Sequence, residues 1–413
     1  MNAKIIQIAK YMAAVASCIL IVGCNDLPTE VGTAFLQDTI GISIVAGQEN
    51  RIMPNAYSYA VTPAAERNTG NILIGINGNT RAAALIRFNV PIGMADIADR
   101  IENCQLHLIP NTYAIGDTIS NQLNFNIMEV TSHWTQETTT PEDVLSSDLL
   151  YAGGMEIAKF SGTINRTDSL TDTLIMDFPK DLLAQWLHNI NDGTNITDTV
   201  WGIAIIPQAG SNIINAFKSY SSAAATPGTF IKIRYWDTAH TTLDSFNMLS
   251  AEETTFAATT DEYNTEDIVL QGATRTHSRF NFNLSEVPQF ASVNLAELTL
   301  TLDEANTVLG NKPVPEQIYM HYFDDTTSGE KLTHSQAVIV GNYDSTSKTY
   351  TFRSFLNYPL NKFVRQQKGI GTLVLTFGSL EYEYNQLNKL AFYGLNATDI
   401  AKRPKFRIVY SAE

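Results

Sequence analysis

The sequence predicts an all-β protein with two tandem, jelly-roll-like β-sandwich domains, each carrying one short amphipathic helix. Apolar and polar residues alternate in many short runs, such as 297–302, which places leucines on one face of a strand and threonines on the other. Gly, Asn, Asp and Pro separate these runs, as turns do in a sandwich. The same series of signals occurs twice along the chain, which indicates a tandem repeat.

The repeat begins with three strand signals in each half of the chain. They are residues 71–75, 85–90 and 101–108 in the first half, and residues 267–272, 279–284 and 293–300 in the second. This alignment makes the strands 85–90 and 279–284 equivalent and predicts that Phe88 and Phe282 are matching core residues. It also aligns Cys104 with Ala296 on an apolar strand, so Cys104 is expected to be a buried structural thiol.

Both halves continue and close in the same way. A strand leads into an amphipathic helix at 180–188 and again at 360–366, with Trp186 on the apolar face of the first helix. A final strand follows a proline in each half, at 231–235 and at 406–410. The expected organisation is a first sandwich at 39–236, a connector at 237–249 and a second sandwich at 250–413.

The order of these signals resembles that of DNRLRE-type (disaggregatase-related) β-sandwich modules. Their pattern contains an Arg-Phe strand, a Val-Thr-x-x-Trp-Thr-x-x-Thr turn, a Trp helix and a final strand that follows Arg-Pro. This chain matches the pattern at Arg87-Phe88, the turn 130–138, Trp186, Arg403-Pro404 and Tyr410, while its second half lacks the Trp-Thr turn. The resemblance implies tandem sandwiches. Because some such modules sit beside polysaccharide-degrading domains, it also implies a polysaccharide ligand.

Residues 1–23 form an expected lipoprotein signal peptide. Lys4 and Lys10 are their only charged side chains, and the apolar stretch 11–22 is too short to span a bilayer, which takes about 20 residues. The stretch ends in a lipobox, so Cys24 is the expected lipidation site. Residues 24–38 then form a lipidated tether, and the protein is expected in the outer membrane, on its periplasmic face or at the cell surface.

The start of the mature chain resembles the N-termini of Bacteroidota lipoproteins of an uncharacterised family. Asp26, behind the lipid cysteine, resembles part of a surface-export signal of that phylum. Thr118 and Thr238 follow aspartates in three-residue motifs that resemble O-glycosylation sites of the same phylum. Turns rich in Asp and Thr lie on protein surfaces, so these hydroxyls are candidate modification sites; chance occurrence in loops is the alternative.

Charge and cysteine content narrow the range of partners. The chain has 27 basic and 42 acidic side chains, and loss of the signal peptide with its two lysines leaves 25 basic side chains and a net charge of −17. Such a protein is expected to bind no nucleic acid and to be repelled by anionic membrane surfaces. Cys18 leaves with the signal peptide and Cys24 is lipidated, so Cys104 has no partner for a disulfide.

The sequence lacks the common catalytic and phosphate-binding motifs. It has no His-Glu-x-x-His, no Gly-x-Ser-x-Gly, no phosphate-binding Gly-rich loop and no Cys-x-x-Cys, and its seven histidines show no metal-ligand spacing. Asp261, Asn264 and Asp267 offer oxygen ligands suited to Ca²⁺, although a solvated turn explains the same residues. No other cofactor is expected. Whether the protein is an enzyme stays open, with a non-catalytic protein favoured.

Tyrosines are the candidate ligand-binding residues. Tyr382 and Tyr384 alternate with glutamates on one expected strand, so both rings should lie on the same face. Tyr319 and Tyr322, from another strand, extend the expected platform. Such rings stack on the apolar faces of sugars while carboxylates bond the hydroxyls; packing in the core or at a sheet edge is the alternative.

Three functions are compatible with these features. The first is a lipid-anchored, non-catalytic envelope protein whose sandwiches bind a polysaccharide or an envelope partner protein. The second is a structural component of a surface layer or a secretion assembly. The third is a polysaccharide-degrading enzyme with an unrecognised site. The missing catalytic motifs favour the first two functions.

Overall fold

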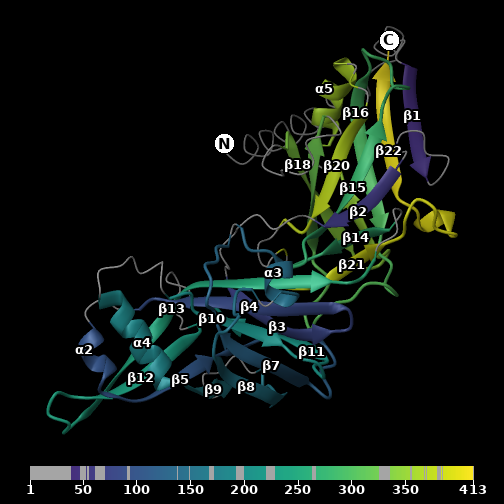
Figure 1. The fold of residues 1–413 in the computed structure, drawn as a ribbon. Coiled ribbons are helices and arrows are strands. Elements are labelled where there is room, and N and C mark those ends of the chain that lie inside the picture. The colour runs from purple at the N-terminus through teal and green to yellow at the C-terminus, as the bar shows by residue number, and fades with distance from the viewer. Residues whose placement is uncertain are drawn as a thin grey trace, which may run out of the picture.

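A computed structural model describes residues 39–46, 53, 55–60, 70–90, 94–136, 138–147, 149–166, 172–191, 200–219, 228–262, 267–324, 335–353, 356–366, 368, 370–378, 383 and 385–412. Within these residues the strands form two antiparallel sheet systems, one above the other in Figure 1, and the helices are few and short. None of these helices is long and apolar enough to cross a membrane. The protein therefore has the all-β, two-domain sandwich fold that its sequence predicts.

The first domain contains eleven of the described strands and three of the described helices. The strands are β3 (Asn71–Asn77), β4 (Thr80–Phe88), β5 (Ile101–Leu108), β6 (Pro110–Gly116), β7 (Gln122–Glu129), β8 (Glu156–Thr163), β9 (Leu174–Phe178), β10 (Ile203–Pro207), β11 (Ile213–Lys218), β12 (Phe230–Trp236) and β13 (Leu243–Thr259). The helices are α2 (Ala95–Ala98), α3 (Pro141–Leu145) and α4 (Lys180–Asn191). One layer has the order β9-β5-β12-β13 and the other the order β13-β4-β3-β11-β6, with β10, β7 and β8 branching from β4.

Strand β13 joins the two layers of the first domain. Its first half pairs with β12 and its second half with β4, and the register shifts between Ser250 and Glu252, where the strand passes from one layer to the other. Apolar side chains that alternate along the strands fill the core, among them Phe88 and Phe178. Trp186 of α4 lies 6.3 and 5.5 Å from these two rings, centroid to centroid, so the apolar face of the helix packs on the core.

The second domain repeats this plan. Its strands are β14 (Ile268–Gln271), β15 (Thr276–Asn283), β16 (Ser292–Thr301), β17 (Gln317–Phe323), β18 (Ala337–Asp344), β19 (Thr349–Phe352), β20 (Ile370–Thr376), β21 (Lys389–Phe392) and β22 (Lys405–Ala412), with helix α5 (Asn357–Arg365) and the 3-10 helix η6 (Ile400–Lys402). β16 pairs with β22 and β19 as β5 pairs with β12 and β9. Phe88 is 2% exposed and Phe282 is 0% exposed, so the predicted matching core positions are confirmed.

The domain boundaries differ from those expected. β1 (Thr39–Ala46) pairs with β22, and β2 (Asn55–Ala60) pairs with β15, so both N-terminal strands belong to the second domain. The expected connector at 237–249 is instead a turn closed by a hydrogen bond from Asp237 N to Thr242 O (2.9 Å), followed by the first half of β13. A hairpin with the next strand requires little loop closure, which explains why β13 occupies this edge of β12. The first domain is thus inserted into the second, between β2 and β14.

Hydrogen bonds and apolar packing join the two domains. The hydroxyl of Tyr113 in β6 accepts from Leu387 N at 2.8 Å and donates to Asn388 Oδ1 at 3.1 Å. Ala114 N donates to Asn311 Oδ1, and Asn311 N donates back to Ala114 O, both at 3.0 Å. Burial raises the pKa of Tyr113, so its hydroxyl stays protonated and can donate. These paired contacts fix the geometry of the surface where the domains meet.

Candidate ligand-binding cleft between the domains

Two adjoining cavities lie where the domains meet. One has a volume of about 300 Å³ and the other about 480 Å³, and both are lined by Asn79, Asp261 and Lys389. Asn79 belongs to the first domain, Lys389 to the second, and Asp261 to the segment that connects β13 with β14. We call the two cavities together the inter-domain cleft. Domain interfaces are preferred places for ligand sites, because two surfaces there create a concave wall.

The turn between β3 and β4 presents two amide side chains to the cleft. Asn77 ends β3, and Gly78 and Asn79 form a tight turn before β4 begins. Gly78 has a φ of +55°, which glycine adopts without the steric penalty of a side chain. Asn79 O accepts a hydrogen bond from Thr260 N at 3.1 Å, which holds the turn beside the end of β13.

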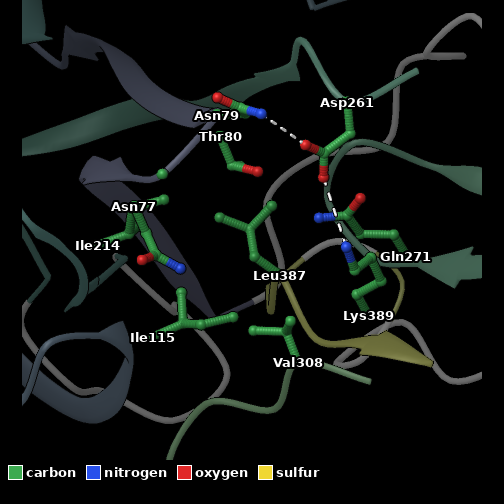
Figure 2. Close-up of a pocket in the computed structure, with 11 residues that line it drawn as sticks. Asn77, Asn79, Thr80, Ile115, Ile214, Asp261, Gln271, Val308, Leu387 and Lys389 are labelled. Atoms are coloured by element: carbon green, nitrogen blue, oxygen red, sulfur yellow. Dashed lines mark hydrogen bonds and ion pairs between the residues drawn. The ribbon is translucent and has the colours of Figure 1, made fainter. Parts of the chain in front are cut away.

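The carboxylate of Asp261 lies between side chains of the two domains. Asn79 Nδ2 donates to one of its oxygens at 2.9 Å, and Lys389 Nζ lies 3.4 Å from the other (Figure 2). The Lys389 and Asp261 side chains are 20% and 27% exposed, so solvent weakens their attraction. A pair of this kind contributes about 0–1 kcal/mol to stability, and a ligand can therefore replace it at little cost.

An apolar wall faces these polar groups in the first cavity. It is formed by Ile115, Ile214, Val308 and Leu387. In Figure 2, Leu387 lies between Asp261 on one side and Ile115 and Val308 on the other. Apolar walls with a few fixed polar groups are typical of ligand pockets, because the apolar part gains from burial and the polar part sets orientation.

Carboxylates are concentrated in the second cavity. Its lining includes Asp261, Glu262, Asp267, Asp303 and Asn306. Asp303 is already engaged within its own turn, where it accepts from Ala305 N at 3.1 Å and from Asn306 Nδ2 at 2.7 Å. This end of the cleft therefore offers mainly hydrogen-bond acceptors, whereas Lys389 supplies a donor from the shared wall.

The structure brings the predicted Ca²⁺ ligands together only in part. Asp261 and Asp267 line the same cavity, while Asn264 lies outside the described residues. A cation at Asp261 would compete with the ammonium group of Lys389. In the part of the chain that the structure describes, no group of three or more His, Cys, Asp or Glu side chains is arranged to hold a metal ion.

The predicted tyrosine platform is not formed by β17. Tyr322 is 2% exposed and packs in the core 5.9 Å from the ring of Phe282, so the prediction that it binds a ligand is wrong. Tyr319 lies on the opposite face of the strand, half-buried against Gly378. Residues three apart on a strand point to opposite faces, which explains why the two rings cannot share a platform. Tyr382 and Tyr384 lie outside the described residues.

Both candidate glycosylation sites lie in exposed turns. Thr118 is exposed next to Asp117, whose pKa is lowered by hydrogen bonds from the hydroxyl and the backbone amide of Ser120 and from the backbone amide of Ile119. Thr238 is exposed in the turn between β12 and β13, where the side chain of Asp237 accepts a hydrogen bond from Thr241 N at 2.7 Å. Their modification stays a prediction, as does lipidation of Cys24, which lies outside the described residues.

The Trp-Thr turn of the first domain has a packing role. Trp134 is 1% exposed, and its Nε1 donates to Trp201 O at 2.8 Å. The guanidinium of Arg87 lies 4.9 Å from the Trp134 ring and pairs with Glu252 at 3.1 Å.

Cys104 is buried as expected, and this burial raises the pKa of its thiol to about 12, which makes it a poor nucleophile.

The sequence pointed to Asp261 and Asp267 of the cleft, as candidate Ca²⁺ ligands, but not to Asn79 or Lys389. Asn77-Gly78-Asn79 is a clear turn signal, but such a signal does not say which surface the turn faces. Lys389 stands in no motif and reaches Asp261 only because β21 pairs with β14. The buried contact between His277 Nε2 and Glu383 Oε1 was also missed, because 105 intervening residues separate the partners.

The chain matches no model of a known protein family and no curated protein. Its resemblance to DNRLRE-type modules and to Bacteroidota lipoproteins therefore stays a prediction.

Proposed function

We propose that this protein is a non-catalytic, lipid-anchored glycan-binding protein of the cell envelope, with the inter-domain cleft as its binding site. The observation that carries the proposal is the convergence of amide, carboxylate and ammonium groups from both domains beside an apolar wall. The lipobox at Cys24 supports the anchor, and the resemblance to polysaccharide-associated modules supports the ligand class.

The chemistry of the cleft suits a hydroxyl-rich ligand. An amide donates and accepts hydrogen bonds, a carboxylate accepts, and an ammonium group donates, so Asn79, Asp261 and Lys389 together match the mixed donors and acceptors of neighbouring sugar hydroxyls. Ile115 and Leu387 offer apolar surface to the C–H face of a sugar ring. Both cavities are partly open to solvent, which fits a segment of a longer polysaccharide.

A screen of residues 25–413 against soluble polysaccharides tests this function. Binding is measured by retardation in polysaccharide-containing gels, and product release is measured on the same samples. Retardation without products is the expected result. Product release would overturn the non-catalytic part of the proposal, and the absence of binding to any polysaccharide would favour a structural role in an envelope assembly.

A paired substitution in the cleft locates the site. Asp261→Ala with Lys389→Ala is expected to weaken binding at least tenfold, because it removes an acceptor and a donor from the shared wall. The matched control is Glu304→Ala with Lys348→Ala, an exposed ion pair with a 3.2 Å separation. Equal affinity of the two double variants would show that the ligand binds elsewhere.

The anchor has its own test in the native host. Cys24→Ala should leave an unprocessed precursor that takes up no labelled palmitate, because the acyl group is attached through the thiol. Normal processing and labelling of that variant would rule out lipidation at Cys24.

A further inference from the structure

One end of the second domain exposes aromatic rings beside basic side chains. Phe290, in the turn between β15 and β16, is 85% exposed, and Tyr358 of α5 is 79% exposed. Lys362 and Arg365 follow Tyr358 by four and seven residues, so the three side chains lie along one stripe of the helix while the opposite stripe is buried. Within the described residues, neither Lys362 nor Arg365 forms an ion pair.

A side-chain clamp holds this turn and this helix together. Asn361 of α5 accepts from Val293 N at 2.6 Å and donates to Val293 O at 2.8 Å, at the start of β16. Phe290 precedes Val293 by three residues. We define Phe290, Tyr358, Lys362 and Arg365 as the end patch.

The chain enters the second domain at the same end. Thr39 pairs with Ala412, and Ser292 pairs with Ser411, so β1 starts beside the start of β16 and the end of β22 (Figure 1). α5 lies at this end as well, while the first domain lies at the other end of the second domain (Figure 1). The preceding residues, 24–38, begin with the expected lipidated cysteine. A lipid anchor at Cys24 would therefore join the second domain at the end that carries the end patch, and not at the end that meets the first domain.

We propose that the end patch is a membrane-contact surface for anionic phospholipid headgroups. The rings of Phe290 and Tyr358 enter the interfacial layer, and Lys362 and Arg365 bind headgroup phosphates. Aromatic rings favour this layer because it accepts both their apolar and their polar parts. Each basic side chain near an anionic surface strengthens binding on the order of fivefold. The orientation rests on the proposed anchor at Cys24, whereas the chemistry of the surface does not.

The net charge of −17 does not prevent this contact. Exposed charges further apart than about 8 Å are largely screened at physiological ionic strength, so a headgroup responds to the nearest side chains. The turn that carries Phe290 contains one acid, Glu286, against two basic residues on the helix stripe. The repulsion expected from the whole chain therefore applies to the other faces of the protein.

Tethered vesicles test the proposal without depending on lipidation. Residues 25–413 carry an N-terminal histidine tag and are attached to vesicles that contain nickel-chelating lipid. The lipid is either phosphatidylcholine alone or phosphatidylcholine with about 30% phosphatidylglycerol, a range in which anionic surface potential acts on basic residues. Phe290→Cys carries an environment-sensitive fluorophore, and Ile119→Cys, at a residue 97% exposed in the first domain, carries the same fluorophore as the matched control. Cys104 is buried and does not compete for the label.

The expected result is a blue shift and quenching by lipid-borne quenchers at position 290 on the anionic vesicles, with neither effect at position 119. Lys362→Glu with Arg365→Glu should remove at least nine-tenths of the quenching at position 290, while Arg234→Glu, at an exposed residue of the first domain, should leave it unchanged. Equal quenching at positions 290 and 119 would overturn the proposal. Quenching that is as strong on phosphatidylcholine alone would overturn the role of the basic side chains. Because attachment uses the tag, either failure is distinct from a failure of lipidation or of glycan binding.

Discussion

The two domains share one strand plan but are completed by different segments of the chain. In the first domain, β13 follows β12 directly and pairs with it as a hairpin. In the second domain, the same edge of β22 is occupied by β1, from the opposite end of the chain. The second domain is thus completed by β1, which precedes the first domain in sequence, and the first domain is completed by β13, which precedes β14 of the second. The comparison teaches that proximity along the chain explains the edge strand of the first domain, where a hairpin requires little loop closure, but not that of the second, where the edge strand comes from the opposite end of the chain.

The outer faces of the equivalent sheets differ as well. In the first domain the segment between β7 and β8 covers this face, and Trp134 of that segment packs with Leu85 of β4 in one buried apolar cluster. At the position of Leu85 the second domain has Arg279, and at the position of Met128 it has His321, as the matching registers show. The same backbone plan therefore carries an apolar face in one domain and a polar face in the other.

Removal of the N-terminal strands β1 and β2 should have the largest effect on stability. Deletion of residues 39–60 exposes the edges of β22 and β15, so the second domain is expected to lose its cooperative thermal unfolding, while the first domain keeps its own. Calorimetry of the full chain and of the deletion variant measures this directly. As the counterpart, residues 70–262 should fold alone, because they contain every strand of the first domain. Retention of both unfolding transitions after the deletion would show that the second domain does not need β1 and β2 to fold.

Truncation of the matching core rings should have the next largest effect. Phe88→Ala and Phe282→Ala are each expected to lower the free energy of unfolding of their own domain by about 3–5 kcal/mol, because each leaves a cavity at a fully packed site. Chemical denaturation followed separately in each domain checks the prediction. A loss below about 1 kcal/mol at either site would show that the two positions are not equivalent.

The two domains should also differ in the pH dependence of their stability, with a smaller effect than that of the core substitutions. Burial, and then the neighbouring His277, lower the pKa of His321 from its ordinary 6.5 to about 4. Between these pH values the unfolded chain binds a proton that the folded chain does not. The contribution of neutral His321 to the free energy of unfolding is therefore complete above pH 6.5 and is lost as the pH falls toward 4.

Replacement of His321 by the residue at the equivalent position of the first domain isolates its effect on acid-induced unfolding. His321→Met introduces the residue found at the equivalent position, Met128, and should remove roughly 2–3 kcal/mol of the acid-induced loss in the second domain. Denaturation of both proteins at pH 7 and pH 4 supplies the difference. An unchanged pH profile would mean that other groups govern acid unfolding.

Disruption of the cleft should have the smallest effect on stability. Lys389→Met removes a partly exposed partner of Asp261 and is expected to change the free energy of unfolding by less than about 1 kcal/mol. Thermal unfolding of the variant checks this value. A larger loss would show that the pair serves to hold the domains together, and would weaken its role as a replaceable ligand contact.

The sequence by itself determined the strands, the repeat and much of the core. These features depend on alternation over five to ten residues, which is local, and so Phe88, Phe282 and the helix that carries Trp186 could be predicted. The period of two along a strand also places Tyr319 and Tyr322 on opposite faces, so their separation follows from the sequence without tertiary information. The buried Cys104 was predictable for the same reason, from its place on an apolar strand.

Only the tertiary structure decided which segment completes which domain and where the cleft lies. The local pattern of β1 and β13 does not say which edge each strand occupies; the choice depends on loop closure and on packing of the whole chain. Asn79, Asp261 and Lys389 are separated by more than a hundred residues from one to the next. They meet because the first domain is inserted into the second, which brings the turn after β3 and the start of β21 to the two sides of one carboxylate.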